Sequence, residues 1–148
     1  MPKTFHDLVA FQRALDLMVA VYDATACFPR SELFGLTSQL RRAACGVVSQ
    51  IAEGQGRITY GEWRQLLSQA RGSLYEVEAQ CLASERLAFL SPAAYAHLKI
   101  HLEVTGKTLS GLIRWVRKHE KVSGNRQQAT GNQEPATKAR ICIPPGAQ

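Results

Sequence analysis

Two histidines, His97 and His101, stand four residues apart, a spacing that puts both rings on one face of a helix, as helical metal sites require. A metal site needs a third ligand, and no Cys, Asp or Glu stands at position 94, 104 or 105 to supply one from that face. A small metallo-enzyme built on this pair stays open as one hypothesis. We nevertheless predict no metal and no other cofactor.

Other catalytic arrangements are absent from the sequence. Glu76 and Glu78 lie two residues apart, so on a helix they point about 200° apart and cannot share a proton. No glycine-rich phosphate loop and no nucleophile elbow occurs. Glu53 lies near a predicted helix end, where a carboxylate is unfavourable without a cation, so we expect an ion pair with Arg42 or Arg57. We predict no catalytic residue and a non-enzymatic protein.

The composition predicts a single cytoplasmic domain, and the net positive charge favours an acidic binding partner. The chain has 148 residues, of which 45% are hydrophobic, and carries 18 Lys and Arg against 12 Asp and Glu, a formal charge of +6. Its apolar runs are too short to cross a membrane, and the first residues lack the layout of a signal peptide. The four cysteines form no CxxC pair, which is typical of buried thiols in a reducing compartment.

Basic residues gather toward the end of the last helical pattern. Lys107, Arg114 and Lys121 share one outer heptad position, and Lys118 lies on the same side. This strip is either an ordinary solvated face or a surface that contacts phosphates. Only Trp115 lies within it, so base stacking is weakly supported. The predicted nucleic-acid-binding residues are Arg41, Arg42, Arg57, Lys107, Arg114, Arg117, Lys118 and Lys121.

Four helical patterns must position these side chains. Apolar residues recur at helical spacing from Thr4 to Phe28, from about Ser31 to Gly54, from Thr59 to about Phe89, and from Ser91 onward. Thr59-x-x-Glu62 predicts a capping box at the third start, and Ser91-Pro92 predicts a cap followed by proline at the first helical position of the fourth. The expected core residues are Leu8, Phe11, Leu15, Met18 and Tyr22; Leu33, Leu36, Leu40, Ala43 and Val47; Trp63, Leu67, Ala70, Leu74, Val77, Cys81 and Ala88; and Tyr95, Leu98, Leu102, Thr105, Leu109, Leu112 and Val116. Small residues around Gly46 indicate a close helix neighbour.

The fold class that follows is all-α. Long helices with short connections predict an antiparallel up-down four-helix bundle over residues 1–121. Residues 122–148 are rich in Gly, Asn, Gln, Pro and Thr, which predicts a disordered C-terminal tail.

Several apolar residues fall outside the expected core stripes, at outer heptad positions on all four helices. They are Leu17, Phe34, Val48, Tyr75, Leu82, Ile100 and Val104. They indicate either a homo-oligomer interface or a core whose register is misplaced. A second functional hypothesis uses the same residues: a protein-interaction scaffold in which Leu17, Ile100 and Val104 hold a polypeptide partner and nucleic acid is not bound directly.

Several motifs resemble a known family. They are Phe5-x-Asp7-Leu8-x-x-Phe11-Gln12-x-Ala14, Phe28-Pro29-x-x-Glu32-x-Phe34-Gly35-Leu36-x-x-Gln39-Leu40-Arg41-Arg42-Ala43-Ala44, Ile51-Ala52-Glu53-Gly54 and Ala70-x-Gly72-Ser73-Leu74-x-Glu76. In this order and spacing, over about residues 5–117, they resemble the four-helix-bundle proteins encoded by intervening sequences of 23S ribosomal RNA genes. That family is similar to the accessory variability determinant proteins of diversity-generating retroelements. Gly46 and Gln50 depart from the family's common Ser and Asn.

The resemblance implies a homopentamer with a central channel, a basic surface for RNA or DNA and, in the retroelement relatives, association with a reverse transcriptase. It brings no catalytic residue. Together with the charge, it favours a non-enzymatic, homo-oligomeric accessory protein that binds nucleic acid.

Overall fold

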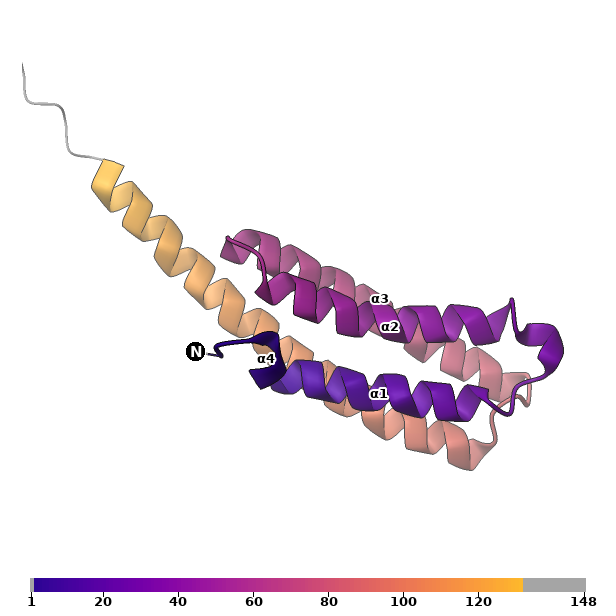
Figure 1. Ribbon diagram of the computed structural model, residues 1–148. Helices are drawn as coiled ribbons and strands as arrows, with labels where there is room; N and C mark the ends of the chain where they lie inside the picture. The colour runs from indigo at the N-terminus through magenta and orange to yellow at the C-terminus, as the bar shows by residue number, and fades with distance from the viewer. Residues whose placement is uncertain (1, 132–148) are drawn as a thin grey trace, which may run out of the picture.

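The computed structural model describes residues 2–131, with side chains described as far as residue 124, and every regular element in that part of the chain is helical. The four long helices are α1 (Val9–Thr25), α2 (Leu36–Gln55), α3 (Tyr60–Arg86) and α4 (Pro92–Gly131), and consecutive helices run in opposite directions (Figure 1). α1 packs against α2 and α4, and α3 packs against the same two helices. The predicted all-α four-helix bundle is therefore confirmed.

Short 3-10 turns precede the first two long helices, which consequently begin later than the sequence predicts. In the turn η1 (Phe5–Asp7), the backbone N–H of Thr4 donates to Asp7 Oδ2 at 3.0 Å. The turn η2 (Arg30–Glu32) places the Glu32 carboxylate where it accepts the N–H of Leu36 at 2.9 Å. Each acidic residue thus satisfies a backbone donor close to the start of its helix.

The starts of α3 and α4 follow the predicted capping signals. The N–H of Glu62 donates to Thr59 Oγ1 at 3.2 Å, and the N–H of Thr59 donates to Glu62 Oε2 at 3.2 Å. The N–H of Ala94 donates to Ser91 Oγ at 3.1 Å, and Pro92 occupies the first helical position. These caps fix where α3 enters the bundle and where α4 starts back along it.

The end of α3 is a left-handed turn made by an alanine. The N–H of Phe89 donates to the carbonyl of Ser84 and the N–H of Ala88 to that of Glu85, the paired bonds of a Schellman motif. Ala88 therefore has a φ of 59° and is exposed. The expectation that it lies in the core is wrong, because α3 ends at Arg86.

The core covers a wider face of α1 than the one predicted: Leu8 and Phe11 are buried as expected, and Leu15 and Met18 are half-buried against the core. Leu17 is fully buried, so the expectation that it faces away from the bundle is wrong, whereas Tyr22 is 42% exposed. α1 carries two apolar stripes side by side. The buried one includes Ala10 and Ala14, whose small side chains allow close approach of the neighbouring helices.

The other core predictions hold for the most part. In the stripes of α2 to α4 most of the predicted residues are buried or half-buried, Leu33 and Ala88 are exposed, and Ile113 is a buried residue that the pattern missed. A Cβ on Gly46 would lie 3.3 Å from Ser73 Oγ, so the small residues of α2 do allow a close approach of α3.

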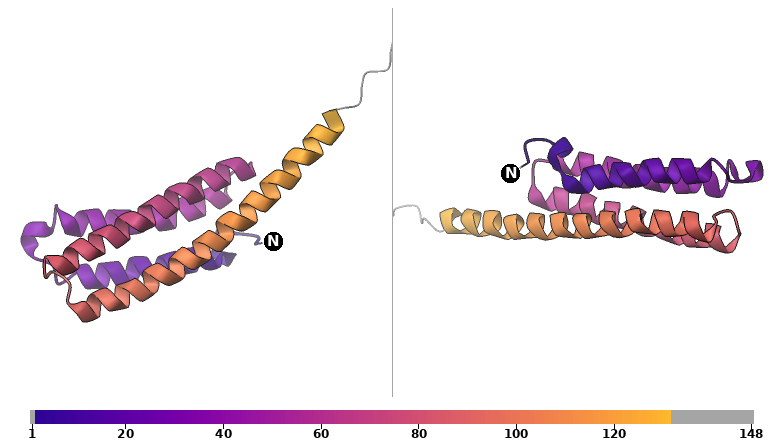
Figure 2. Two further views of the ribbon diagram at one scale, coloured as in Figure 1. Left: turned by 180° about the vertical axis from the view of Figure 1, so that it is seen from behind. Right: turned by 90° about the horizontal axis from the view of Figure 1, so that it is seen from below.

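α4 is the longest helix and continues past the end of the other three (Figure 2). It reaches Gly131, whereas the sequence pattern placed the end of the ordered domain at residue 121. The rest of the predicted tail, residues 132–148, lies outside the described residues.

Candidate nucleic-acid interface

A hollow of about 540 Å³ lies between the start of α3 and the second half of α4. Its lining residues are Arg64, Arg114, Arg117, Lys118, Glu120 and Lys121, and we call it the basic groove. Arg114 and Lys118, and Arg117 and Lys121, form two pairs four residues apart on α4, so the four side chains share one side of the helix. Five cations and one carboxylate leave the groove strongly positive.

The fifth cation, Arg64, comes from α3 and is held by a carboxylate of α4. Arg64 Nε donates to Glu120 Oε2 at 2.8 Å, and its Nη2 lies 3.4 Å from Glu120 Oε1. The side chains are 42% and 35% exposed, so solvent weakens the attraction of this pair. The other four cations take part in no ion pair within the described residues.

The structure brings part of the predicted basic surface into the groove and leaves the rest elsewhere. Lys107 is exposed on α4, two helical turns before Arg114, and does not line the groove. Arg41, near the start of α2, donates from Nε to Thr25 Oγ1 at 2.8 Å and stacks over the ring of Tyr22. It therefore lies at the end of α2 opposite to α3's first turn.

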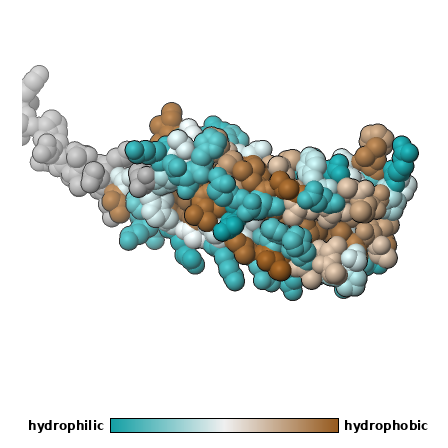
Figure 3. All heavy atoms as spheres, turned by 60° about the horizontal axis from the view of Figure 1, so that its bottom comes forward, coloured by the Kyte–Doolittle hydropathy of each residue, from teal (hydrophilic) through white to brown (hydrophobic). Residues whose placement is uncertain are grey.

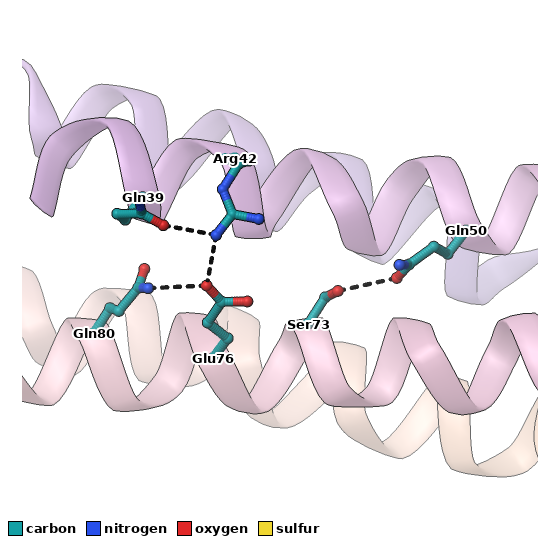
Figure 4. A network of polar contacts seen from close by, with 6 residues as sticks. All are labelled: Gln39, Arg42, Gln50, Ser73, Glu76 and Gln80. Atoms are coloured by element: carbon teal, nitrogen blue, oxygen red, sulfur yellow. Dashed lines mark hydrogen bonds and ion pairs between the residues drawn. The ribbon is translucent and has the colours of Figure 1, made fainter. Parts of the chain in front are cut away.

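Arg42 belongs to a polar network between α2 and α3 (Figure 4). Its Nη2 donates to Glu76 Oε1 at 3.0 Å and to Gln39 Oε1 at 2.6 Å, and the Gln80 amide donates to the same Glu76 oxygen. Further along, Ser73 Oγ donates to Gln50 Oε1 at 3.0 Å. These contacts hold the two helices in register.

Arg57, in the loop after α2, forms an ion pair with Glu53. The prediction that Glu53 is a structural ion-pair partner is thereby confirmed, and Arg57 is the partner. Because the Glu53 carboxylate offsets the charge of Arg57, Arg57 contributes less to a binding surface than a cation without a carboxylate partner.

An aromatic cluster lies beside the basic groove, where the sequence showed only Trp115. The ring of Trp115 stacks on His119 with centroids 3.9 Å apart, and its centroid lies 5.8 Å from that of Trp63. Tyr60 contacts all three, with its ring centroid 5.8 Å from His119 and 6.2 Å from each tryptophan. Tyr60, Trp63, Trp115 and His119 thus join the first turn of α3 to α4, and we call them the aromatic cluster.

A glycine allows this cluster to form. A Cβ on Gly54 would lie only 2.7 Å from Cδ1 of Trp63, so the indole ring packs directly over the backbone of α2. Trp63 is 6% exposed, and its Nε1 is buried and has no hydrogen-bond partner among the described side chains and backbone.

The predicted oligomer-interface residues other than Leu17 retain exposed surface, to different degrees. Phe34 is 93% exposed, Ile100 62% and Tyr75 61%. Leu82 and Val104 are also exposed, whereas Val48 is half-buried against the core. Apolar side chains remain open to solvent among hydrophilic ones on the face that Figure 3 shows.

The histidines and cysteines are among the described side chains with the chemistry of metal ligands or nucleophiles. The rings of His97 and His101 meet edge to face 4.9 Å apart, and within residues 2–124 no three His, Cys, Asp or Glu side chains lie close enough to hold a metal ion. Burial, with a smaller contribution from Glu78, raises the pKa of the Cys81 thiol to about 12, so it is unreactive at neutral pH. Cys27, in contrast, is exposed, unlike the buried thiol that we expected.

Within residues 2–131, none of the helices combines the length and apolar character that crossing a membrane requires.

The fold and the groove define a small helical-bundle protein with a cationic groove at one end. The family described as 23S rRNA-intervening sequence protein matches residues 6–111, so the chain belongs to that family. The match ends before most of the basic groove, because only Arg64 among the lining residues falls inside it. None of the curated proteins compared with the chain matches it.

Proposed function

We propose that the protein is a non-enzymatic accessory protein that binds nucleic acid by its phosphates in the basic groove. The observation that carries the proposal is the set of four cations, Arg114, Arg117, Lys118 and Lys121, that line one hollow without a carboxylate partner in the described residues. Lysine and arginine contacts of this kind neutralise phosphates and carry little sequence information.

Salt dependence tests the mechanism. If about four phosphates are neutralised, log K falls with log salt with a slope of roughly −3. Affinity then drops roughly 50- to 150-fold between 50 and 200 mM salt. Fluorescence anisotropy of a labelled oligonucleotide measures this slope, and an affinity that does not change with salt contradicts the proposal.

Charge-neutralising variants locate the surface. Arg114→Gln, Lys118→Gln and Lys121→Gln should each weaken binding and make the slope shallower by roughly one contact. Lys99→Gln is the matched control, because it removes the same charge from an exposed position of the same helix outside the groove. Equal effects from groove and control variants would assign binding to net charge and not to the groove.

Self-association is a second part of the proposal, supported by exposed apolar residues on separate helices. Ile100 and Val104 line a shallow hollow of about 260 Å³ between α1 and α4, beside Arg13 and Asp16. Light scattering of nuclease-treated protein tests it, and a monomer at all concentrations contradicts it. Five subunits and a reverse-transcriptase partner stay predictions that only the resemblance implies.

The same apolar residues support the alternative of a scaffold for a polypeptide partner. Under that alternative Ile100→Asp abolishes capture of the partner from nuclease-treated extract, and the groove variants have no effect on it. Direct binding of purified protein to an oligonucleotide, lost in the groove variants, decides in favour of the nucleic-acid interface.

A further inference from the structure

Tyr60 and Trp63 of the aromatic cluster also line a second, smaller hollow. This hollow has a volume of about 210 Å³ and lies at the loop between α2 and α3; we call it the loop pocket. Its lining residues are Pro2, Gln55, Arg57, Ile58, Thr59, Tyr60 and Trp63. Tyr60 lines the loop pocket, and Arg64, one helical turn later on the same side of α3, lines the basic groove.

The loop pocket offers an apolar wall that nothing in the described chain covers. Ile58 is 97% exposed, the most exposed of the large apolar side chains described. It stands beside the half-buried ring of Tyr60 and the indole of Trp63. The Gln55 amide adds hydrogen-bonding capacity, and Arg57 adds a guanidinium at the rim.

The size of the pocket restricts what can enter. A volume of 210 Å³ equals the share of about seven waters in the liquid, enough for one planar ring system and too small for a drug-sized ligand. An aromatic wall next to a cationic groove is the combination by which proteins hold single strands, because a base stacks while its phosphates are neutralised.

We propose that the protein prefers single-stranded nucleic acid, with the backbone in the basic groove and a base in the loop pocket against Ile58 and Tyr60. This inference rests on the proposed function, since it requires phosphates in the groove. Cβ atoms four residues apart on a helix lie about 5–6 Å from each other, so one nucleotide can reach from Tyr60 to the edge of the basic groove, which Arg64 marks. A duplex keeps its bases stacked inside and cannot place one there without unpairing it.

The two tryptophans of the chain, Trp63 and Trp115, both belong to the aromatic cluster. Intrinsic tryptophan fluorescence therefore reports on a ligand at this end of the bundle without a label. Three probes of equal length are titrated at low salt: a single-stranded oligothymidylate, the same strand with abasic sites throughout, and a duplex. We expect the intact strand to bind at least about five-fold more tightly than the abasic strand and to perturb the fluorescence most.

Two variants separate the pocket from the groove. Tyr60→Leu keeps an apolar side chain but removes the aromatic ring, and Ile58→Ala changes a residue that is almost fully exposed, so neither depends on a large core rearrangement. Both should weaken the intact strand about five-fold and leave the abasic strand unchanged. Leu87→Ala is the control, because Leu87 is 58% exposed in the turn after α3, at the opposite end of α3 from Tyr60.

The outcomes distinguish the two proposals. Equal binding of intact, abasic and duplex probes with a steep salt dependence overturns the inference and leaves phosphate binding in the groove intact. The inference is also overturned if Ile58→Ala and Tyr60→Leu are folded by circular dichroism and bind the intact strand as tightly as the unmodified protein does. No binding of any probe at low salt overturns both proposals.

Discussion

Replacing Glu120 by glutamine is the most informative single change at the basic groove. Its carboxylate is the one negative group among the lining residues and holds Arg64 through a two-contact ion pair. The amide keeps the shape of the side chain and removes its charge. Arg64 is then free to contact a phosphate, so Glu120→Gln should tighten nucleic-acid binding although it breaks a contact between α3 and α4.

The size of the effect follows from counterion release. One further phosphate contact makes the salt slope steeper by about 0.7 to 0.9. If the variant and the unmodified protein bind equally at 1 M salt, the variant then binds roughly four- to five-fold more tightly at 0.15 M salt. The loss of stability should stay below about 1 kcal/mol, because both side chains are more than a third exposed and solvent screens the pair.

Anisotropy titrations over a salt series and thermal unfolding measure the two effects. Glu103→Gln is the matched control, an exposed acid of the same helix outside the groove. Tighter binding in both variants would show that only net charge matters. Weaker binding of Glu120→Gln would refute the reasoning, since it would mean that the Glu120 carboxylate positions Arg64 for phosphate instead of competing with it.

The remaining predictions concern the fold. Ala88→Gly should stabilise the protein by about 1 kcal/mol and raise the Tm by about 3 °C, because glycine adopts a φ of 59° without steric cost; a lower Tm would contradict that turn geometry. Gly54→Ala should cost about 1–3 kcal/mol in denaturant unfolding, since its Cβ overlaps the indole ring beside it, and an unchanged midpoint would place that ring elsewhere. Leu17→Ala should cost about 2–5 kcal/mol as a core cavity, and a cost near zero would return this residue to the surface. At pH 8, the exposed Cys27 should be alkylated rapidly, whereas Cys81 should react only on unfolding, because the Cys81 pKa of about 12 keeps that thiol protonated. Equal alkylation rates for the two cysteines would show that Cys81 is accessible.

Structural features that a few consecutive residues determine, such as helix caps, were predicted well. The reciprocal cap of Thr59 and Glu62 and the cap formed by Ser91 need only three or four consecutive residues, and the structure contains both. The face of α1 was predicted only in part, because its two apolar stripes both fit a helical period: Leu8 and Phe11 are buried as expected, but Leu17 was assigned to the outer surface. Only the packing of α2 and α4 against α1 decides that Leu17 is buried and Tyr22 is exposed.

The candidate site likewise combines a pattern that the sequence shows with contacts that only the packing of two helices creates. The spacing of Arg114, Lys118 and Lys121 along one helix indicates a basic side without knowledge of the fold. Arg64 and Tyr60 join that side only because the first turn of α3 packs next to the second half of α4. A pattern read along one helix cannot show a contact that two helices make 56 residues apart in sequence.

The exposed apolar residues of α4 and its part of the basic groove lie at different positions along the helix. Ile100 and Val104 belong to its first half, near Arg13 of α1, whereas the basic groove begins at Arg114. Ten residues from Val104 to Arg114 correspond to about 15 Å of helix, so a partner seated on the apolar residues need not cover the cations. Self-association and nucleic-acid binding are therefore compatible on one chain. Copies that associate through the apolar half would add their grooves together and strengthen the positive field that attracts a phosphate backbone.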